Sequence, residues 1–107
     1  MTPQDVERIV KSQLADPDLT GPLGAEDVQA ALVSPYLQSF ILGDTYDQMV
    51  APTKSVVSYW VVAVGQLYTL FYDPQVGDFG LADLVKDGVM PQTAGVRGDL
   101  VSTFRAM

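Results

Sequence analysis

The side chains best suited to chemistry in this chain are aspartates at predicted turns. Asp73 and Asp78 flank one turn, and Asp83 and Asp87 follow in the next hairpin. Two carboxylates held close together can act as general acid and general base, as in glycoside hydrolysis. Asp is also common at turns because its side chain hydrogen-bonds the local backbone. The chain has no His and no Cys, so we predict no catalytic residues and no enzyme activity.

A second acidic segment, Asp16 to Asp27, resembles the calcium loop of EF-hand proteins. Asp16, Asp18 and Thr20 match its first, third and fifth positions, and Asp27 matches the twelfth. The resemblance implies a calcium site between two helices. Two prolines stiffen the segment, however, and Asp27 is shorter than the glutamate usual at that position. A helix–helix connector with helix-capping carboxylates explains the same residues, so we predict no metal and no cofactor, with an EF-hand-like calcium module as an alternative.

The charge of the chain is negative and unevenly distributed. Thirteen acidic and six basic residues give a net charge of −7 over 107 residues. Residues 1–50 hold eight of the acidic residues and two of the basic ones, which is a net charge of −6. The negative electrostatic field of such a chain opposes binding to nucleic acid and to anionic lipid. It favours a basic protein partner.

We therefore predict a partner-binding surface made of acidic and aromatic side chains from the first half of the chain. The acids would steer a basic protein toward this surface, and the tyrosines would form contacts. The predicted residues are Asp16, Asp18, Glu26, Asp27, Asp44, Asp47, Tyr36 and Tyr46. The predicted function is a non-catalytic protein-binding domain, of the inhibitor or immunity type, that blocks a basic partner. The alternative is a small protein that binds an apolar ligand.

The length of the chain supports one domain, 1–107. Its first helix is predicted to begin with a capping box at Thr2 and Asp5 and to end at Pro17. A loop follows, and a second helix is predicted from near Gly24 to Pro35, which forces a stop. Asp99 is typical of the residue that caps a short C-terminal helix.

The segment between the second and the last helix shows the pattern of an antiparallel meander. The predicted strands are 36–42, 55–64, 67–72, 79–85 and 89–96, and 46–51 is either a short strand or part of a loop. Gly65-Gln66 suits a two-residue type II′ turn. We therefore predict an α+β fold with two N-terminal helices, a meander sheet of three to five strands and a short C-terminal helix.

The strongest predicted strand, Ser55 to Val64, is apolar on both faces. A strand of this kind lies in the middle of a sheet and is covered on both sides. Three short helices cover one face well, so the second face needs long loops, a partner or a second copy of the chain. A homodimer is one way to provide that cover.

The segment that contains Trp60, Leu67–Pro74 and Gly77–Phe79 resembles small bacterial immunity proteins and other inhibitor proteins. In these proteins a meander sheet is decorated by helices, and the surface is often acidic. The resemblance implies an inhibitory function. The N-terminus lacks the features of a secretory signal, and the longest apolar run, Val61–Val64, is far shorter than the ~20 residues of a membrane span. We expect a cytoplasmic protein that does not bind membranes.

Overall fold

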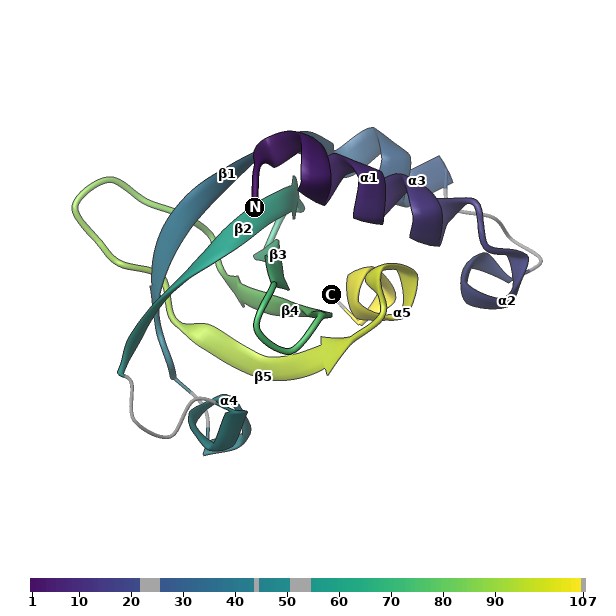
Figure 1. Ribbon diagram of the computed structural model, residues 1–107. Coiled ribbons are helices and arrows are strands. Elements are labelled where there is room, and N and C mark those ends of the chain that lie inside the picture. The colour runs from purple at the N-terminus through teal and green to yellow at the C-terminus, as the bar shows by residue number, and fades with distance from the viewer. Residues whose placement is uncertain (22–25, 44, 51–54, 107) are drawn as a thin grey trace.

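The computed structural model describes residues 1–21, 26–43, 45–50 and 55–106. It has an α+β fold, as predicted, with N-terminal helices, a five-stranded antiparallel sheet and a short C-terminal helix. The elements in chain order are α1 (Pro3–Leu14), α2 (Pro17–Thr20), α3 (Glu26–Ala31), β1 (Leu32–Ile41), α4 (Thr45–Val50), β2 (Val56–Val64), β3 (Tyr68–Asp73), β4 (Asp78–Asp83), β5 (Thr93–Gly98) and α5 (Leu100–Arg105). Figure 1 shows their arrangement.

The predicted caps of the first and last helices are confirmed. The backbone N–H of Asp5 donates to Thr2 Oγ1 over 3.2 Å, and the N–H of Thr2 donates to the Asp5 carboxylate over 2.9 Å. The hydrogen bond from the Thr2 backbone N–H to the carboxylate is the largest cause of the lowered pKa of Asp5. At the other end of the chain, the Asp99 carboxylate accepts from the N–H of Ser102 and begins α5.

Proline positions account for two errors in the predicted elements. Pro35 was predicted to end the second helix. In the structure α3 already ends at Ala31, and Pro35 lies within β1, which begins at Leu32. The β1–β2 register shifts between Leu32 and Tyr36, and a bulge is a place where a strand tolerates proline. Pro17 lies at the first position of α2, within the predicted loop, where a missing N–H costs nothing. The predicted start of the second helix near Gly24 lies outside the described residues.

Two further predictions are wrong. Segment 46–51 is neither strand nor loop, because its described part belongs to helix α4. Gly65 does not form a type II′ turn, since that turn needs a positive φ at its first central residue. Gly65 is not among the described glycines with positive φ, which are Gly21, Gly77, Gly88 and Gly95.

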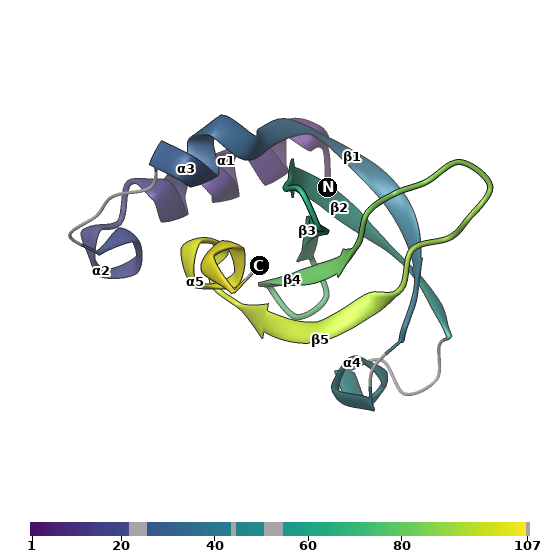
Figure 2. The ribbon, with the colours of Figure 1, turned by 180° about the vertical axis from the view of Figure 1, so that it is seen from behind.

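The sheet follows the chain order β1-β2-β3-β4-β5 and curls strongly (Figures 1 and 2). The curl brings the end of β1 to the segment that leads into β5. There the N–H of Ile41 donates to the carbonyl oxygen of Pro91 over 2.9 Å, and the N–H of Gly43 donates to Thr93 Oγ1 over 3.1 Å. The first and last strands of the meander therefore meet, and the sheet becomes a partly closed barrel.

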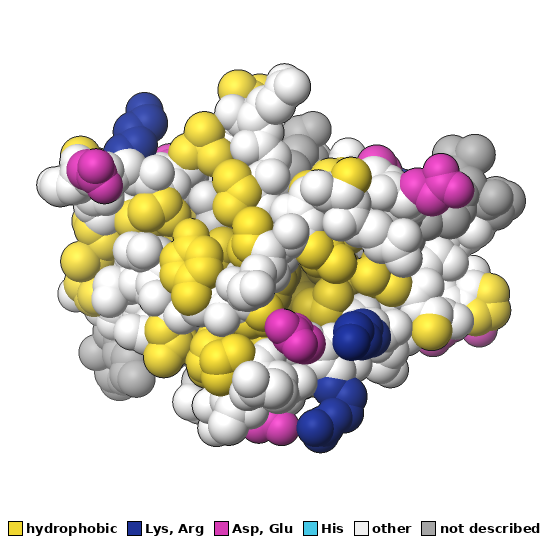
Figure 3. Space-filling model, turned by 90° about the horizontal axis from the view of Figure 1, so that it is seen from above, with side chains coloured by type: hydrophobic (Ala, Val, Ile, Leu, Met, Phe, Trp, Pro, Cys, Tyr) yellow, Lys and Arg dark blue, Asp and Glu magenta, His cyan; other side chains and the backbone are white. Residues whose placement is uncertain are grey.

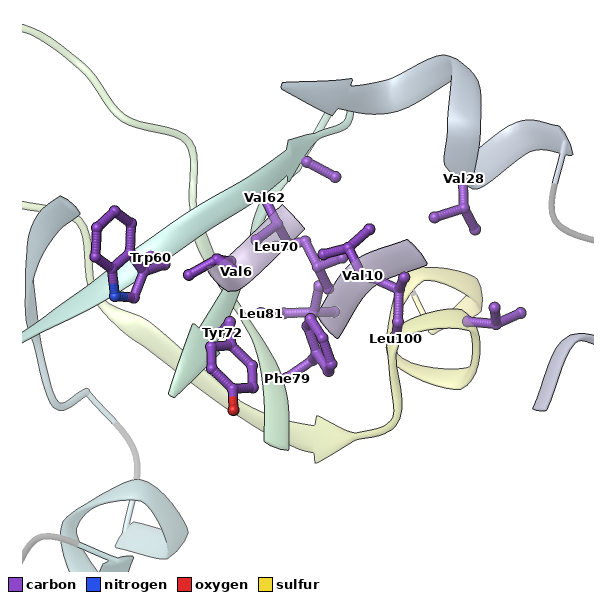
Figure 4. Close-up of a cluster of buried hydrophobic side chains, with 12 residues drawn as sticks. Val6, Val10, Val28, Trp60, Val62, Leu70, Tyr72, Phe79, Leu81 and Leu100 are labelled. Carbon is purple, nitrogen blue, oxygen red and sulfur yellow. The ribbon is translucent and has the colours of Figure 1, made fainter. Parts of the chain in front are cut away.

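Each face of the curled sheet has its own core. The outer core lies between the sheet and helices α1, α3 and α5, and Figure 4 shows its side chains. The inner core lies on the opposite face and is formed by Phe40, Leu42, Val57, Tyr59, Val61, Phe71 and Ala82. The apolar pattern on both faces of β2 follows from these two cores. Because the curl buries the second face within the chain, the reason for predicting a second copy no longer applies.

Candidate functional site

A buried ionic cluster lies at the inner face of the sheet and is centred on Arg97 of β5. The guanidinium donates from Nε to Asp47 Oδ1 over 2.6 Å. Its Nη1 donates to Asp73 Oδ2 over 2.7 Å and to Asp78 Oδ1 over 3.1 Å. The side chains of Arg97, Asp47 and Asp73 are only 1–2% exposed. Helix α4 and the β3–β4 hairpin are therefore tied to the last strand through one side chain.

Aromatic rings hold the guanidinium in place. Its Cζ lies 5.5 Å from the ring centroid of Tyr59 and 5.4 Å from that of Phe71. These two rings stack on each other with their centroids 4.7 Å apart. Arg97 Nη2 also donates to the Tyr59 hydroxyl over 3.2 Å. Guanidinium–ring contacts of this kind are strongest where water is excluded.

The sequence around Arg97 explains how the cluster forms. The β4–β5 register shifts between Gly80 and Ala82, so that β5 bulges, and Gly95 adopts a positive φ of 77°. The N–H of Gly95 donates to the second oxygen of Asp47 over 2.8 Å. A glycine allows this backbone conformation without steric cost. The bulge thus satisfies both oxygens of a buried carboxylate, one with the backbone and one with Arg97.

The ionic cluster is better suited to hold the fold together than to catalyse a reaction. Burial opposes the charged form of Arg97, but hydrogen bonds to Asp47 and Asp73 raise its pKa above the ordinary value. Burial also raises the pKa of Asp78, and Arg97 works against this change. The predicted carboxylate pair, Asp73 and Asp78, does come together across the β3–β4 hairpin. Both carboxylates are occupied by Arg97, and Asp73 is withdrawn from solvent.

Exposed apolar side chains gather at the opposite end of the sheet from α4. In a meander, the β2–β3 turn and the β4–β5 loop lie at the same end, and here they carry a group of residues that we call the turn-end surface. Its members and their exposed fractions are Val64 (39%), Leu67 (73%), Val85 (40%), Val89 (63%) and Met90 (40%). Leu67, Val89 and Met90 line a common hollow of about 330 Å³, so the two loops form one surface.

A second hollow, of about 300 Å³, lies between α1 and β1. Apolar side chains from both elements and from β2 form its floor. The polar residues that line it are Glu7, Lys11 and Ser34. Figure 3 looks down on this side of the molecule. It shows a depression with a hydrophobic floor near the centre, flanked by one acidic and one basic side chain, and hydrophobic side chains over much of the half nearer the β4–β5 loop.

The predicted partner-binding residues do not form one surface. Four acids belong to α2, its cap and α3: Asp16, Asp18, Glu26 and Asp27. Tyr46 lies on α4, at the other end of the molecule (Figures 1 and 2), and is 54% exposed. Tyr36 is 41% exposed on β1. The prediction for Asp47 is wrong, because this side chain is buried against Arg97 and cannot steer a partner. Asp44 lies outside the described residues.

Two carboxylates of the EF-hand-like segment accept hydrogen bonds from the local backbone. The Asp16 carboxylate accepts from the N–H of Asp18 and caps α2, and the Asp27 carboxylate accepts from the N–H of Val28. Within residues 1–21, 26–43, 45–50 and 55–106, no group of three or more acidic side chains is placed to hold a metal ion. In the same part of the chain, no helix combines the length and the apolar character of a membrane span.

Comparison with known proteins gives no relative for this chain. No family model matches its sequence, no curated protein matches it, and no solved structure matches its fold.

Proposed function

We propose that this chain is a non-catalytic protein-binding domain whose contact region is the turn-end surface. The observation that carries the proposal is the exposure of Leu67, Val89 and Met90, which are 73%, 63% and 40% exposed around one hollow. Contiguous apolar patches on small proteins mark interaction sites. Asp83 and Lys86 border the same hollow, and an apolar centre with a polar rim is the usual composition of an interface.

The proposed partner is a basic protein, and the proposed role is to block it as an inhibitor or immunity-type protein does. The net charge of −7 supports a basic partner. Asp18, Glu26 and Asp27 are exposed at the far end of the molecule from the β4–β5 loop. Acids at that distance speed the encounter through the long-range field, without forming contacts in the complex.

A comparison of variants tests this proposal. The tagged chain is used to capture partners from the native lysate, and a captured protein is accepted only if it then forms a stoichiometric complex with the purified chain. We expect Leu67→Ser/Val89→Ser/Met90→Ser to abolish that complex. The matched control is Val76→Ser, because Val76 is 51% exposed on the β3–β4 turn, away from the turn-end surface. A complex that survives the triple substitution, or is lost in the control, contradicts the proposed contact region.

A further inference from the structure

We propose that the hollow between α1 and β1 binds a small zwitterion with an aliphatic side chain, that is, a free aliphatic amino acid. This inference does not depend on the protein-binding function, because the hollow and the turn-end surface are lined by different residues. The volume of about 300 Å³ lies at the small end of the range for ligand sites. A small ligand therefore fits it better than a cofactor.

A bulge in β1 creates the hollow. The β1–β2 register passes from Leu32 opposite Ala63 to Tyr36 opposite Val61. Residues 33–35 of β1 therefore stand opposite a single residue of β2. The surplus residues leave the strand pairing and form one wall of the hollow. Bulges are frequent beside functional sites because they redirect the chain at one place without disturbing the rest of the sheet.

The floor of the hollow is aliphatic. Val10 of α1 and Val62 of β2 lie at its base and are 5% and 1% exposed. Leu32, Val33 and Pro35 complete the apolar lining. None of these lining side chains is aromatic, and none carries a polar group. The floor therefore matches the branched apolar body of a small ligand, which gains free energy when it leaves water.

Two opposite charges stand above this floor. Glu7 and Lys11 line the hollow and lie one helical turn apart on α1. In the described structure neither of them forms an ion pair, whereas their neighbours Asp5 and Arg8 pair with each other over 3.6 Å. A carboxylate and an ammonium beside one apolar floor complement the ammonium and the carboxylate of an amino acid. A ligand with only one charge would leave one of the two side chains without a partner.

A titration followed by NMR tests the site with three probes of similar shape. L-leucine carries both charges, 4-methylpentanoate carries only the carboxylate, and 3-methylbutylamine carries only the ammonium. We expect leucine to shift the amide signals of Val10, Val33 and Val62 with a Kd at or below about 1 mM. Each single-charge probe should bind at least about tenfold more weakly, because one charge-assisted hydrogen bond is lost.

Variants separate the site from general surface effects. Glu7→Gln and Lys11→Met should each weaken leucine binding at least about tenfold. Arg8→Gln is the matched control, since Arg8 lies on the same helix and is not part of the hollow, so it should leave the Kd unchanged. The proposal is overturned if leucine causes no shifts at these residues, if either single-charge probe binds as tightly as leucine, or if Glu7→Gln and Lys11→Met bind leucine like the unmodified chain.

Discussion

Asp47 and Arg97 are fifty residues apart in the sequence, and their side chains meet over 2.6 Å in the interior of the protein. Each is at most 2% exposed. Their contact joins α4 to β5 at the place where the sheet closes on itself. Because an ion removed from water needs an opposite charge and hydrogen bonds, each of these two buried side chains depends on the other.

Removal of the cation from the ionic cluster should be strongly destabilising. Arg97→Met keeps much of the side-chain volume but leaves Asp47 and Asp73 buried without their opposite charge. We expect the free energy of unfolding to fall by about 3–5 kcal/mol, measured by urea denaturation followed by circular dichroism. Arg8→Gln breaks an exposed ion pair and should change the free energy by no more than about 0.5 kcal/mol. Equal effects of the two substitutions would show that the ionic cluster has no special role.

Asp78 gives the ionic cluster a dependence on pH. Burial raises its pKa in the folded protein, so the folded state holds this proton more tightly than the unfolded state does. The stabilisation from this proton is fully present below the pKa that Asp78 has in the unfolded chain. It is lost as the pH rises through the pKa that Asp78 has in the folded protein. Asp78→Asn cannot ionise. The free energy of unfolding of this variant, relative to that of the unmodified chain, should therefore increase from about pH 4 to pH 7. Urea denaturation at each pH measures this difference.

Asp5 provides a control of opposite sign. Hydrogen bonds from Thr2 lower the pKa of Asp5, so its contribution is present above the unfolded pKa and is lost as the pH falls through the folded pKa. The stability of Asp5→Asn relative to the unmodified chain should therefore decrease as the pH rises over the acidic range. If Asp78→Asn shows the same trend as Asp5→Asn, the sign assigned to Asp78 is incorrect.

Gly80 is required because an aromatic ring occupies the space above it. A Cβ atom at Gly80 would clash with Cζ of Phe71, whose ring also contacts Tyr59 and Arg97. Gly80→Ala should therefore lower the free energy of unfolding by about 1–3 kcal/mol, measured by urea denaturation. At Gly98, the nearest atom to an added Cβ is Thr103 Oγ1 at 3.4 Å, and Gly98→Ala should cost less. The reverse order would contradict this packing.

The four acids of α2, its cap and α3 should affect the rate of partner binding more than the lifetime of the complex. The substitutions Asp16→Asn, Asp18→Asn, Glu26→Gln and Asp27→Asn remove four negative charges, and Asn at position 16 preserves a helix cap. We expect slower association with a basic partner and a weaker dependence on salt, because salt screens the steering field. Surface plasmon resonance at several salt concentrations measures both rates. A faster dissociation with unchanged association would place these acids in the contact region instead.

Local sequence signals predicted the elements whose structure is determined locally. The capping residues Thr2 and Asp99 correctly marked the starts of α1 and α5. The apolar pattern of β2 correctly indicated burial on both faces. At α4 local signals failed, because the helix is fixed by contacts with distant residues. Asp47 reaches Arg97 and Gly95, and no local pattern records such partners.

The ionic cluster could not be predicted for the same reason. Its carboxylates come from α4 and from both ends of the β3–β4 turn, and a sheet that closes on itself is needed to bring them to Arg97. One signal was available in the sequence, since Arg97 is the single charged residue of the segment that forms β5. A lone charge in a strand needs either solvent or a buried partner. The pattern alone does not decide between the two.

Hydrogen–deuterium exchange on the chain, free and in complex with its purified partner, tests the proposed contact region most directly. If the turn-end surface is that region, slower exchange on binding will be found in residues 64–67 and 84–91. Exchange in α2 and α3 will stay unchanged, because their acids act at a distance. Slower exchange in α2 and α3, without any change in residues 64–67 and 84–91, would contradict the account.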